Sequence, residues 1–299
     1  MGYGSYSYEA HQAMTQARQD LPQQQVFTQK SCHPQMNPKG VKFRESRDSA
    51  AHPNSLSIVF ALDVSGSMGA IPNLLARKHL PSFMKNLMDA GIPDPQVMFM
   101  AIGNAYADKA PLQVGQFESS EKEMDQWLTR MYLEGGGGGV GETYELAMYF
   151  AAEHMQMDCL QKRRKKGYFI MTGDEPAFEK VSQRHIRDLI GDDVPEDLPF
   201  AQVVQRLEKS FEVFFLIPDQ GRRGYEAFWR NHLGNRVICM DAPEDTCSVA
   251  AGLVALNEGA VQSVDDFAAG LRKAGMGGNR VQGIINALTP WSKDLKRAS

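Results

Sequence analysis

The sequence predicts an α/β protein with a doubly wound, mostly parallel central sheet and helices on both faces. The first observation behind this prediction is a pair of apolar runs, at residues 58–62 (I-V-F-A-L) and 211–217 (F-E-V-F-F-L-I). Runs with so little polar alternation are typical of strands that are covered on both faces. The second observation is the repeated alternation of strand-like and helix-like segments between residues 56 and 256, which favours a parallel sheet.

The first half of this region contains three predicted strands. Residues 56–62 form the first one, and residues 96–102 (Q-V-M-F-M-A-I) form a second buried strand after the turn-like sequence G-I-P-D-P. Between them, apolar residues at helical spacing predict a helix over 69–90, whose regular part is limited by Pro72 and Pro81. Residues 112–116 predict a short edge strand. A helix over 120–133 begins at Ser120, a good N-cap with a glutamate three residues later.

The second half continues the alternation. A glycine-rich loop over 135–143 leads into an amphipathic helix that we expect to reach about Cys159. The loop contains a literal G-x-G-x-x-G, but it follows a helix, whereas a dinucleotide-binding loop must follow a strand. A basic run, Q-K-R-R-K-K-G, then leads to the next strand. It is interpreted as a solvated connection, the alternatives being an import signal or an anion-binding patch. The remaining predicted strands are 168–171, 211–217 and 236–240, and the remaining helices are 177–190, 199–209, 224–233 and 244–256.

Two extensions flank the predicted domain, which we place at residues 56–258. Residues 1–55 are polar and carry too few apolar residues for a core of their own, so we expect an arm that packs on the domain or on a partner. Within the arm, residues 8–20 predict a helix that ends before Pro22, and a short extended segment follows. Residues 259–299 predict a small helical C-terminal extension with a polar tail.

Composition excludes several classes of protein. A formal charge of −4 and a pI near 6.0 argue against a general nucleic-acid binder. No apolar run approaches the roughly 20 residues of a membrane span, and the N-terminus lacks the basic and apolar regions of a signal peptide. The four cysteines form no C-x-x-C pair, so we expect free thiols and a cytoplasmic location. Cys32 followed by His33 leaves a zinc site as a minor alternative.

A cluster of oxygen-bearing side chains follows the first predicted strand. Asp63, Ser65 and Ser67 are spaced by two, so a strand end that opens into a loop can direct all three side chains at one point. A carboxylate and two hydroxyls suit a hard cation such as Mg²⁺ or Mn²⁺. Ligands of open α/β sheets bind beyond the carboxyl ends of the strands, which is where these residues fall.

This D-x-S-x-S sequence resembles the metal-ion-dependent adhesion site (MIDAS) of von Willebrand factor A (vWA) domains, and the resemblance covers residues 56–256. It implies the Rossmann-like vWA fold, a threonine ligand from a second loop and an aspartate from a third. Thr143 ends the glycine-rich loop, although residues 140–142 intervene between the glycine run and the threonine. The third loop reads T-G-D-E-P instead of the usual T-D-G, so the resemblance assigns the role to Asp174, with Glu175 as the rival. A helix-capping role for this acidic pair is the alternative.

The resemblance implies a protein-binding module in which the metal coordinates an acidic side chain of a partner. The sequence is similar to those of bacterial cytoplasmic vWA proteins, some of which work with AAA+ ATPases of the MoxR type. The alternative is a metal-dependent, phosphatase-like hydrolase that uses the same cluster. Ser65 stands where a haloacid-dehalogenase-like phosphatase needs a second acid, and no G-x-S-x-G surrounds either serine. We therefore expect no enzymatic activity, no nucleic-acid partner and no membrane partner.

Overall fold

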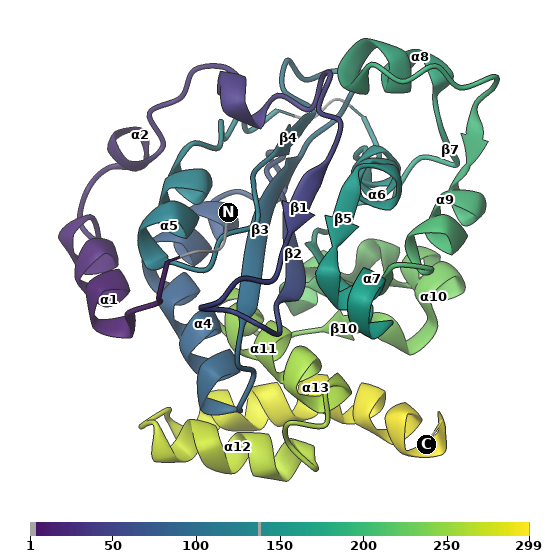
Figure 1. The fold of residues 1–299 in the computed structure, drawn as a ribbon. Helices are drawn as coiled ribbons and strands as arrows, with labels where there is room; N and C mark the ends of the chain where they lie inside the picture. Colours follow the sequence, from purple (N-terminus) through teal and green to yellow (C-terminus); the bar gives the residue numbers. More distant parts are fainter. Residues whose placement is uncertain (1–3, 137–138, 299) are drawn as a thin grey trace.

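The centre of the protein is a six-stranded sheet. The computed structural model describes residues 4–136 and 139–298, and Figure 1 shows its fold. The strand order is β10-β9-β6-β2-β3-β4; every neighbouring pair is parallel except β3 and β4. The predicted doubly wound, mostly parallel sheet is therefore confirmed. The strands are β2 (Leu56–Asp63), β3 (Pro95–Ile102), β4 (Leu112–Val114), β6 (Gly167–Thr172), β9 (Phe211–Ile217) and β10 (Val237–Cys239).

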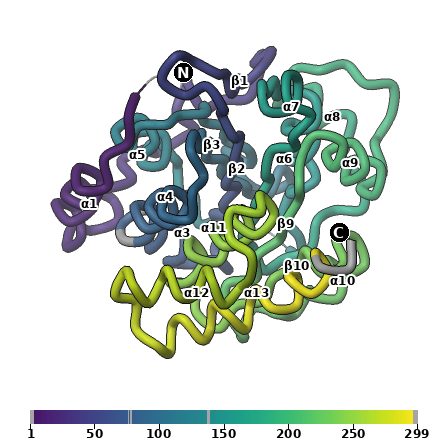
Figure 2. The backbone as a smooth tube through the Cα atoms, turned by 60° about the horizontal axis from the view of Figure 1, so that its bottom comes forward, coloured from purple at the N-terminus to yellow at the C-terminus, as the bar shows by residue number. Residues whose placement is uncertain are grey.

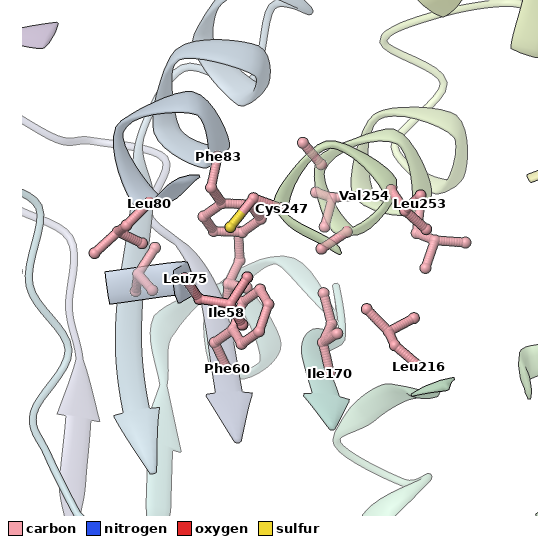
Figure 3. Close-up of a cluster of buried hydrophobic side chains, with 14 of the residues drawn as sticks. Ile58, Phe60, Leu75, Leu80, Phe83, Ile170, Leu216, Cys247, Leu253 and Val254 are labelled. Carbon is pink, nitrogen blue, oxygen red and sulfur yellow. The ribbon is translucent and has the colours of Figure 1, made fainter. Parts of the chain in front are cut away.

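Helices cover both faces of this sheet because alternate residues of its strands are buried on opposite sides. On β2, Ile58 and Phe60 point into one core cluster, while Val59 and Ala61 point into another. Figure 3 shows the first cluster, where Phe60 meets Phe83 edge-to-face at a centroid distance of 5.5 Å. Helices of the first layer are α3 (Ile71–Leu74), α4 (Leu80–Asp89), α5 (Glu121–Thr129) and α11 (Thr246–Asn257). Those of the second layer are α6 (Tyr144–Glu153), α7 (Asp158–Arg163), α9 (Phe200–Leu207) and α10 (Glu226–Leu233).

Several predicted elements have different bounds or types. The helix predicted over 69–90 is divided into α3, a π-helical turn (Leu75–His79) and α4, in keeping with its two prolines. The helix expected to reach Cys159 ends at Glu153, because β5 (Met155–Met157) pairs in parallel with β1 (Arg44–Ser46). The prediction of one continuous helix there was wrong, since the arm supplies a strand partner that local sequence does not reveal.

The helix predicted over 177–190 was also wrong. Ala177 bridges to Glu142 in extended conformation, and β7 (Lys180–Val181) pairs with β8 (Leu198–Pro199). Only α8 (Gln183–His185) and a following π-helical turn (Ile186–Ile190) are helical. Contacts with the glycine-rich loop and with β8 thus replace local helical hydrogen bonds.

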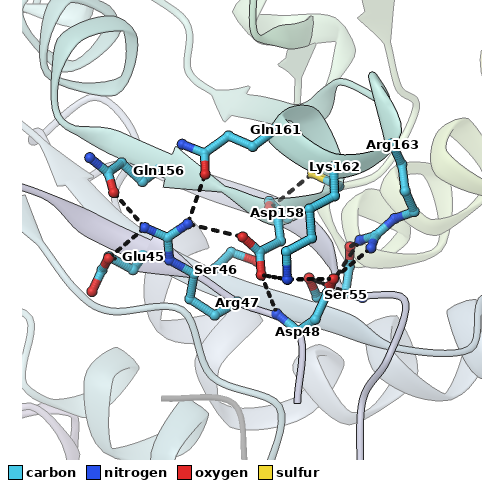
Figure 4. A network of polar contacts seen from close by, with 12 residues as sticks. Glu45, Ser46, Arg47, Asp48, Ser55, Gln156, Asp158, Gln161, Lys162 and Arg163 are labelled. Carbon is cyan, nitrogen blue, oxygen red and sulfur yellow. Dashed lines mark hydrogen bonds and ion pairs between the residues drawn. The ribbon is translucent and has the colours of Figure 1, made fainter. Parts of the chain in front are cut away.

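The arm packs along the domain. Its helix α1 (Tyr8–Ala17) lies against α4 and α5, where Arg18 pairs with Asp125. The segment after Pro22, which we expected to be extended, forms the short helix α2 (Gln23–Val26). Further on, Arg47 hydrogen-bonds to Asp158 at 2.9 Å, and Asp48 pairs with two cations of the basic run, Lys162 and Arg163 (Figure 4). The boundaries proposed for the arm and the domain stay predictions.

The C-terminal segment forms two helices, α12 (Val264–Lys273) and α13 (Gly278–Ala298), which lie beside α11 (Figure 2). We expected a polar tail, but α13 continues to Ala298. It buries Val281, Leu288 and Trp291. The ring of Trp291 meets that of Phe214 edge-to-face, with 5.2 Å between the ring centroids. In the described part of the chain, no helix is long and apolar enough to span a membrane.

Candidate functional site

Three loops meet at the carboxyl edge of the sheet, where the strand order changes direction between β2 and β6. The register aligns Leu62 with Thr172, so Asp63 at the end of β2 lies level with Gly173. On the other side, Asp63 pairs with Ile102, the last residue of β3. This is the crevice in which open α/β sheets bind their ligands. The alternation of predicted strands and helices along the sequence indicated this position for Asp63.

A continuous series of polar contacts joins Asp63, Ser65, Ser67 and Asp174. The Ser65 amide donates to Oδ1 of Asp63 at 2.8 Å, and the two serine hydroxyl oxygens are 3.1 Å apart. The Ser67 hydroxyl then donates to Oδ1 of Asp174 at 2.7 Å. Four of the five predicted site residues are therefore linked by consecutive hydrogen bonds, and they come from two different loops.

Thr143, the fifth predicted residue, lies at the start of α6 and turns toward the end of β3. Its amide donates to the Gly103 carbonyl at 3.0 Å, and its hydroxyl donates to the same oxygen. Because that hydroxyl gives away its proton, its lone pairs stay available to accept from another group or to bind a cation. Residues 137 and 138 of the glycine-rich loop lie outside the described residues.

Tyr144, which the sequence prediction missed, connects this loop to Asp63. Its hydroxyl donates to Oδ2 of Asp63, and its ring is fully buried between Phe215 and Trp229. A Cβ atom on residue 173 would lie 2.0 Å from that hydroxyl. Only glycine leaves this space, so the T-G-D order in the third loop is the sequence counterpart of the Tyr144 contact. The unusual Gly173 was the signal that could have indicated a bulky neighbour.

Asp174 and Glu175 point in different directions. Asp174 contacts Ser67, whereas the Glu175 carboxylate accepts a hydrogen bond from the Gly141 amide at 3.3 Å. The backbone carbonyl of Glu175 accepts from Trp229 Nε1 at 2.9 Å and so fixes this loop to α10. The geometry places the carboxylate of Asp174, and not that of Glu175, next to the two serines.

The carboxylates of the site are crowded and poorly solvated. Burial, together with the neighbouring Asp174 charge, raises the pKa of Asp63 to about 7. Burial also raises the pKa of Glu142 to about 9, with further contributions from Asp63, Asp108, Glu175 and Asp174. One carboxyl oxygen of Glu142 is buried without a hydrogen-bond partner. A bound cation would relieve the like-charge repulsion among these carboxylates, so the residues present fit a cation.

Arg222 is the second residue that the sequence prediction missed. It follows β9, and its Nε lies 3.4 Å from Oδ2 of Asp174. One terminal nitrogen donates to the Ser67 carbonyl at 3.0 Å, and the other pairs with Asp219. A cationic side chain therefore already lies at the outer side of the cluster.

The type of ligand atom limits the metals that the site suits. Across residues 4–136 and 139–298, no group of three or more His, Cys, Asp or Glu side chains is placed to hold a metal ion. The cluster at the sheet edge instead combines two carboxylates with two hydroxyls, and the Thr143 hydroxyl lies on a neighbouring loop; oxygen ligands of this kind suit a hard ion such as Mg²⁺. The minor zinc alternative gains no support, because no such group that includes Cys32 and His33 is found among these described residues.

A scan against protein-family models finds no match, and a search of curated proteins also finds none. Solved structures resemble the chain at low identity. The pilus adhesin SpaC from Lactobacillus rhamnosus GG is 14% identical, over 73% of this chain and 31% of that chain, with a TM-score of 0.45. The vWF domain of the type V pili tip protein Mfa5 from Porphyromonas gingivalis is 10% identical, over 70% and 97%, with a TM-score of 0.43.

A third structure is proximal thread matrix protein 1 from the mussel byssus, described with a zinc-occupied MIDAS motif. It is 12% identical, over 68% of this chain and 48% of that chain, with a TM-score of 0.40. The chain thus spans less than half of SpaC and of the mussel protein. These descriptions name the type of domain that the D-x-S-x-S sequence resembles. At these identities and TM-scores the likeness concerns the fold alone, and it carries no argument about a metal, a partner or a location.

Proposed function

We propose that the cluster at the carboxyl edge of the sheet binds a divalent cation, Mg²⁺ or Mn²⁺, and that the protein is a metal-dependent protein-binding module of the vWA type. The observation that carries this proposal is the arrangement of Asp63, Ser65, Ser67 and Asp174 in one hydrogen-bonded series around a buried carboxylate. Asp63, Asp174, both serines and Thr143 would hold the ion.

The chemistry of this ligand set favours binding to another protein. Three of the five ligands are neutral hydroxyls, which hold a cation less strongly than carboxylates do, and Asp174 shares its charge with Arg222. Octahedral Mg²⁺ usually keeps some coordination positions for water, and water exchanges for a stronger ligand. A carboxylate from a partner is a stronger ligand than water, because its negative charge attracts the ion. The proposed partner is therefore a protein that presents an aspartate or glutamate side chain.

The sequence resemblance to bacterial cytoplasmic vWA proteins makes an AAA+ ATPase of the MoxR type our proposed partner class, and the cytoplasm our proposed location. Affinity purification in Mg²⁺ and in chelator distinguishes the possibilities. The proposal expects an ATPase among the proteins that chelator releases. Recovery of cell-surface proteins instead would support an adhesin, the class to which SpaC belongs by its description.

Calorimetric titration with MgCl₂ and MnCl₂ tests the cation site. We expect Asp63→Asn to abolish the binding heat, because the substitution removes the buried carboxylate while keeping its shape. Asp241→Asn is the matched control, since Asp241 is an exposed carboxylate just beyond β10. Equal titrations for the wild type and Asp63→Asn would exclude the site. The hydrolase alternative makes a separate prediction: turnover of a phosphate ester that Ser65→Ala abolishes while the cation stays bound.

A further inference from the structure

Arg222 occupies a position from which it can act on the candidate cation site. Its guanidinium contacts Asp174 on one side, the Ser67 carbonyl on another and Asp219 on the third. Two of these contacts involve residues that we propose as cation ligands. The side chain of Arg222 is 29% exposed, so it lies at the protein surface beside the site and is not part of the core.

The Asp174 carboxylate contacts both a hydroxyl and the Arg222 guanidinium. Oδ1 of Asp174 accepts from Ser67, and Oδ2 faces Arg222. Arg222 therefore balances the charge of the outer carboxylate of the cluster, whereas burial and neighbouring acidic groups raise the pKa values of Asp63 and Glu142. The chain itself thus places a positive charge, that of Arg222, on the outer side of the site.

A divalent cation and this guanidinium compete for the same groups. An ion held by Ser67 and Asp174 draws the lone pairs of Asp174 toward itself. It also brings its double positive charge close to the guanidinium of Arg222, and like charges a few ångströms apart repel. We propose that Arg222 regulates the site as an internal competitor: it holds Asp174 and the Ser67 segment in the cation-free state, and cation binding releases it. This inference rests on the proposed cation site.

The local backbone allows such a release. Arg222 lies in the short 3₁₀ segment Gln220–Tyr225, and its own φ and ψ of −104° and 17° interrupt the helical geometry there. The next element, α10, is held by the Trp229 contact with the Glu175 carbonyl and by stacking of Trp229 on Phe215 at 3.7 Å. Release of the guanidinium can therefore change residues 220–225 while α10 stays in place.

Calorimetric titration of the full-length chain with MgCl₂ tests the competition. We expect Arg222→Gln to bind Mg²⁺ roughly three- to tenfold more tightly than the wild type, the range for an ion pair of this exposure plus the relief of repulsion. Arg222→Lys keeps the charge but loses the forked geometry, so its affinity should lie between the two. Arg223→Gln is the matched control. It removes the same charge from the same segment, and Arg223 acts on Glu226 and Cys239 instead.

Amide hydrogen exchange over residues 219–226 supplies a readout that a purely structural role would not produce. Mg²⁺ should accelerate exchange of this segment in the wild type and leave the already fast segment of Arg222→Gln unchanged. Asp63-dependent Mg²⁺ binding with equal affinity in the wild type and Arg222→Gln would overturn the competition and leave the cation site intact. Absence of Asp63-dependent binding from both proteins would overturn the cation site, and with it the regulation.

Discussion

A methyl group added at Gly173 tests the explanation for the T-G-D order. The Cβ atom of Gly173→Ala would lie 2.0 Å from the Tyr144 hydroxyl oxygen and 2.7 Å from its ring carbon Cζ. The ring cannot retreat, because it is fully buried against Phe215 and Trp229. Overpacking of this kind costs about 1–3 kcal/mol, and loss of a hydrogen bond to a charged group about 1.5–3 kcal/mol. We expect a total destabilisation of roughly 2.5–6 kcal/mol from these two effects.

Urea unfolding without divalent cation measures this cost at about pH 9, where Asp63, with a pKa of about 7, is charged. Tyr144→Phe alone keeps the ring and loses only the hydrogen bond to Asp63, so it should cost about 1.5–3 kcal/mol. The double variant with Gly173→Ala should cost less than the sum of the two, because the lost hydrogen bond is counted once. Gly270→Ala is the control, since a Cβ there meets open space inside α12 and should stabilise by roughly 0.5–1 kcal/mol. A Gly173→Ala protein within about 0.5 kcal/mol of the wild type would refute the steric explanation.

Two further predictions concern the third loop and the arm. Asp174→Asn should lose the rise in melting temperature that Mg²⁺ causes, a stabilisation of about 2.7 kcal/mol at a hundredfold excess over Kd. Glu175→Gln should keep that rise, and thermal unfolding with the reverse result would assign the ligand to Glu175. Burial lowers the pKa of His11, in α1, from 6.5 to about 4. Stability from the neutral imidazole is therefore present above pH 6.5 and is lost as the pH falls from 6.5 toward 4, up to roughly 3 kcal/mol. Denaturant unfolding at several pH values should show this loss of stability in the wild type and less of it in His11→Gln. Parallel pH profiles of stability for the two proteins would show that His11 does not cause the loss.

The parts of the fold that local sequence determines were predicted, and the parts that depend on distant contacts were not. The apolar run of β2 and the position of Asp63 at its end follow from patterning alone. β5 could not be predicted in the same way, since its three residues are a strand only because β1 of the arm pairs with them. The same limit applies to the end of α13, which we expected to be a polar tail and whose Trp291 contacts Phe214, a residue far away in the chain.

The site residues likewise differ in whether local sequence indicates their role. Asp63, Ser65 and Ser67 lie in one short motif, and the resemblance to vWA domains indicated Thr143 and Asp174. Tyr144 and Arg222 carry no local signal of a role: one reads as a helix residue and the other as a charge in a loop. Their contacts with Asp63 and Asp174 arise only when β2, β6 and β9 lie side by side.

The most direct test of the cation site is a crystal structure of the protein grown with MnCl₂, with data collected at the manganese absorption edge. The account predicts one anomalous peak at the carboxyl edge of the sheet, at about 2.1 Å from the hydroxyl oxygens of Ser65 and Ser67. It also predicts that the Arg222 guanidinium has moved away from Asp174. An anomalous map with no peak at these serines, from crystals grown at millimolar Mn²⁺, would contradict the central claim.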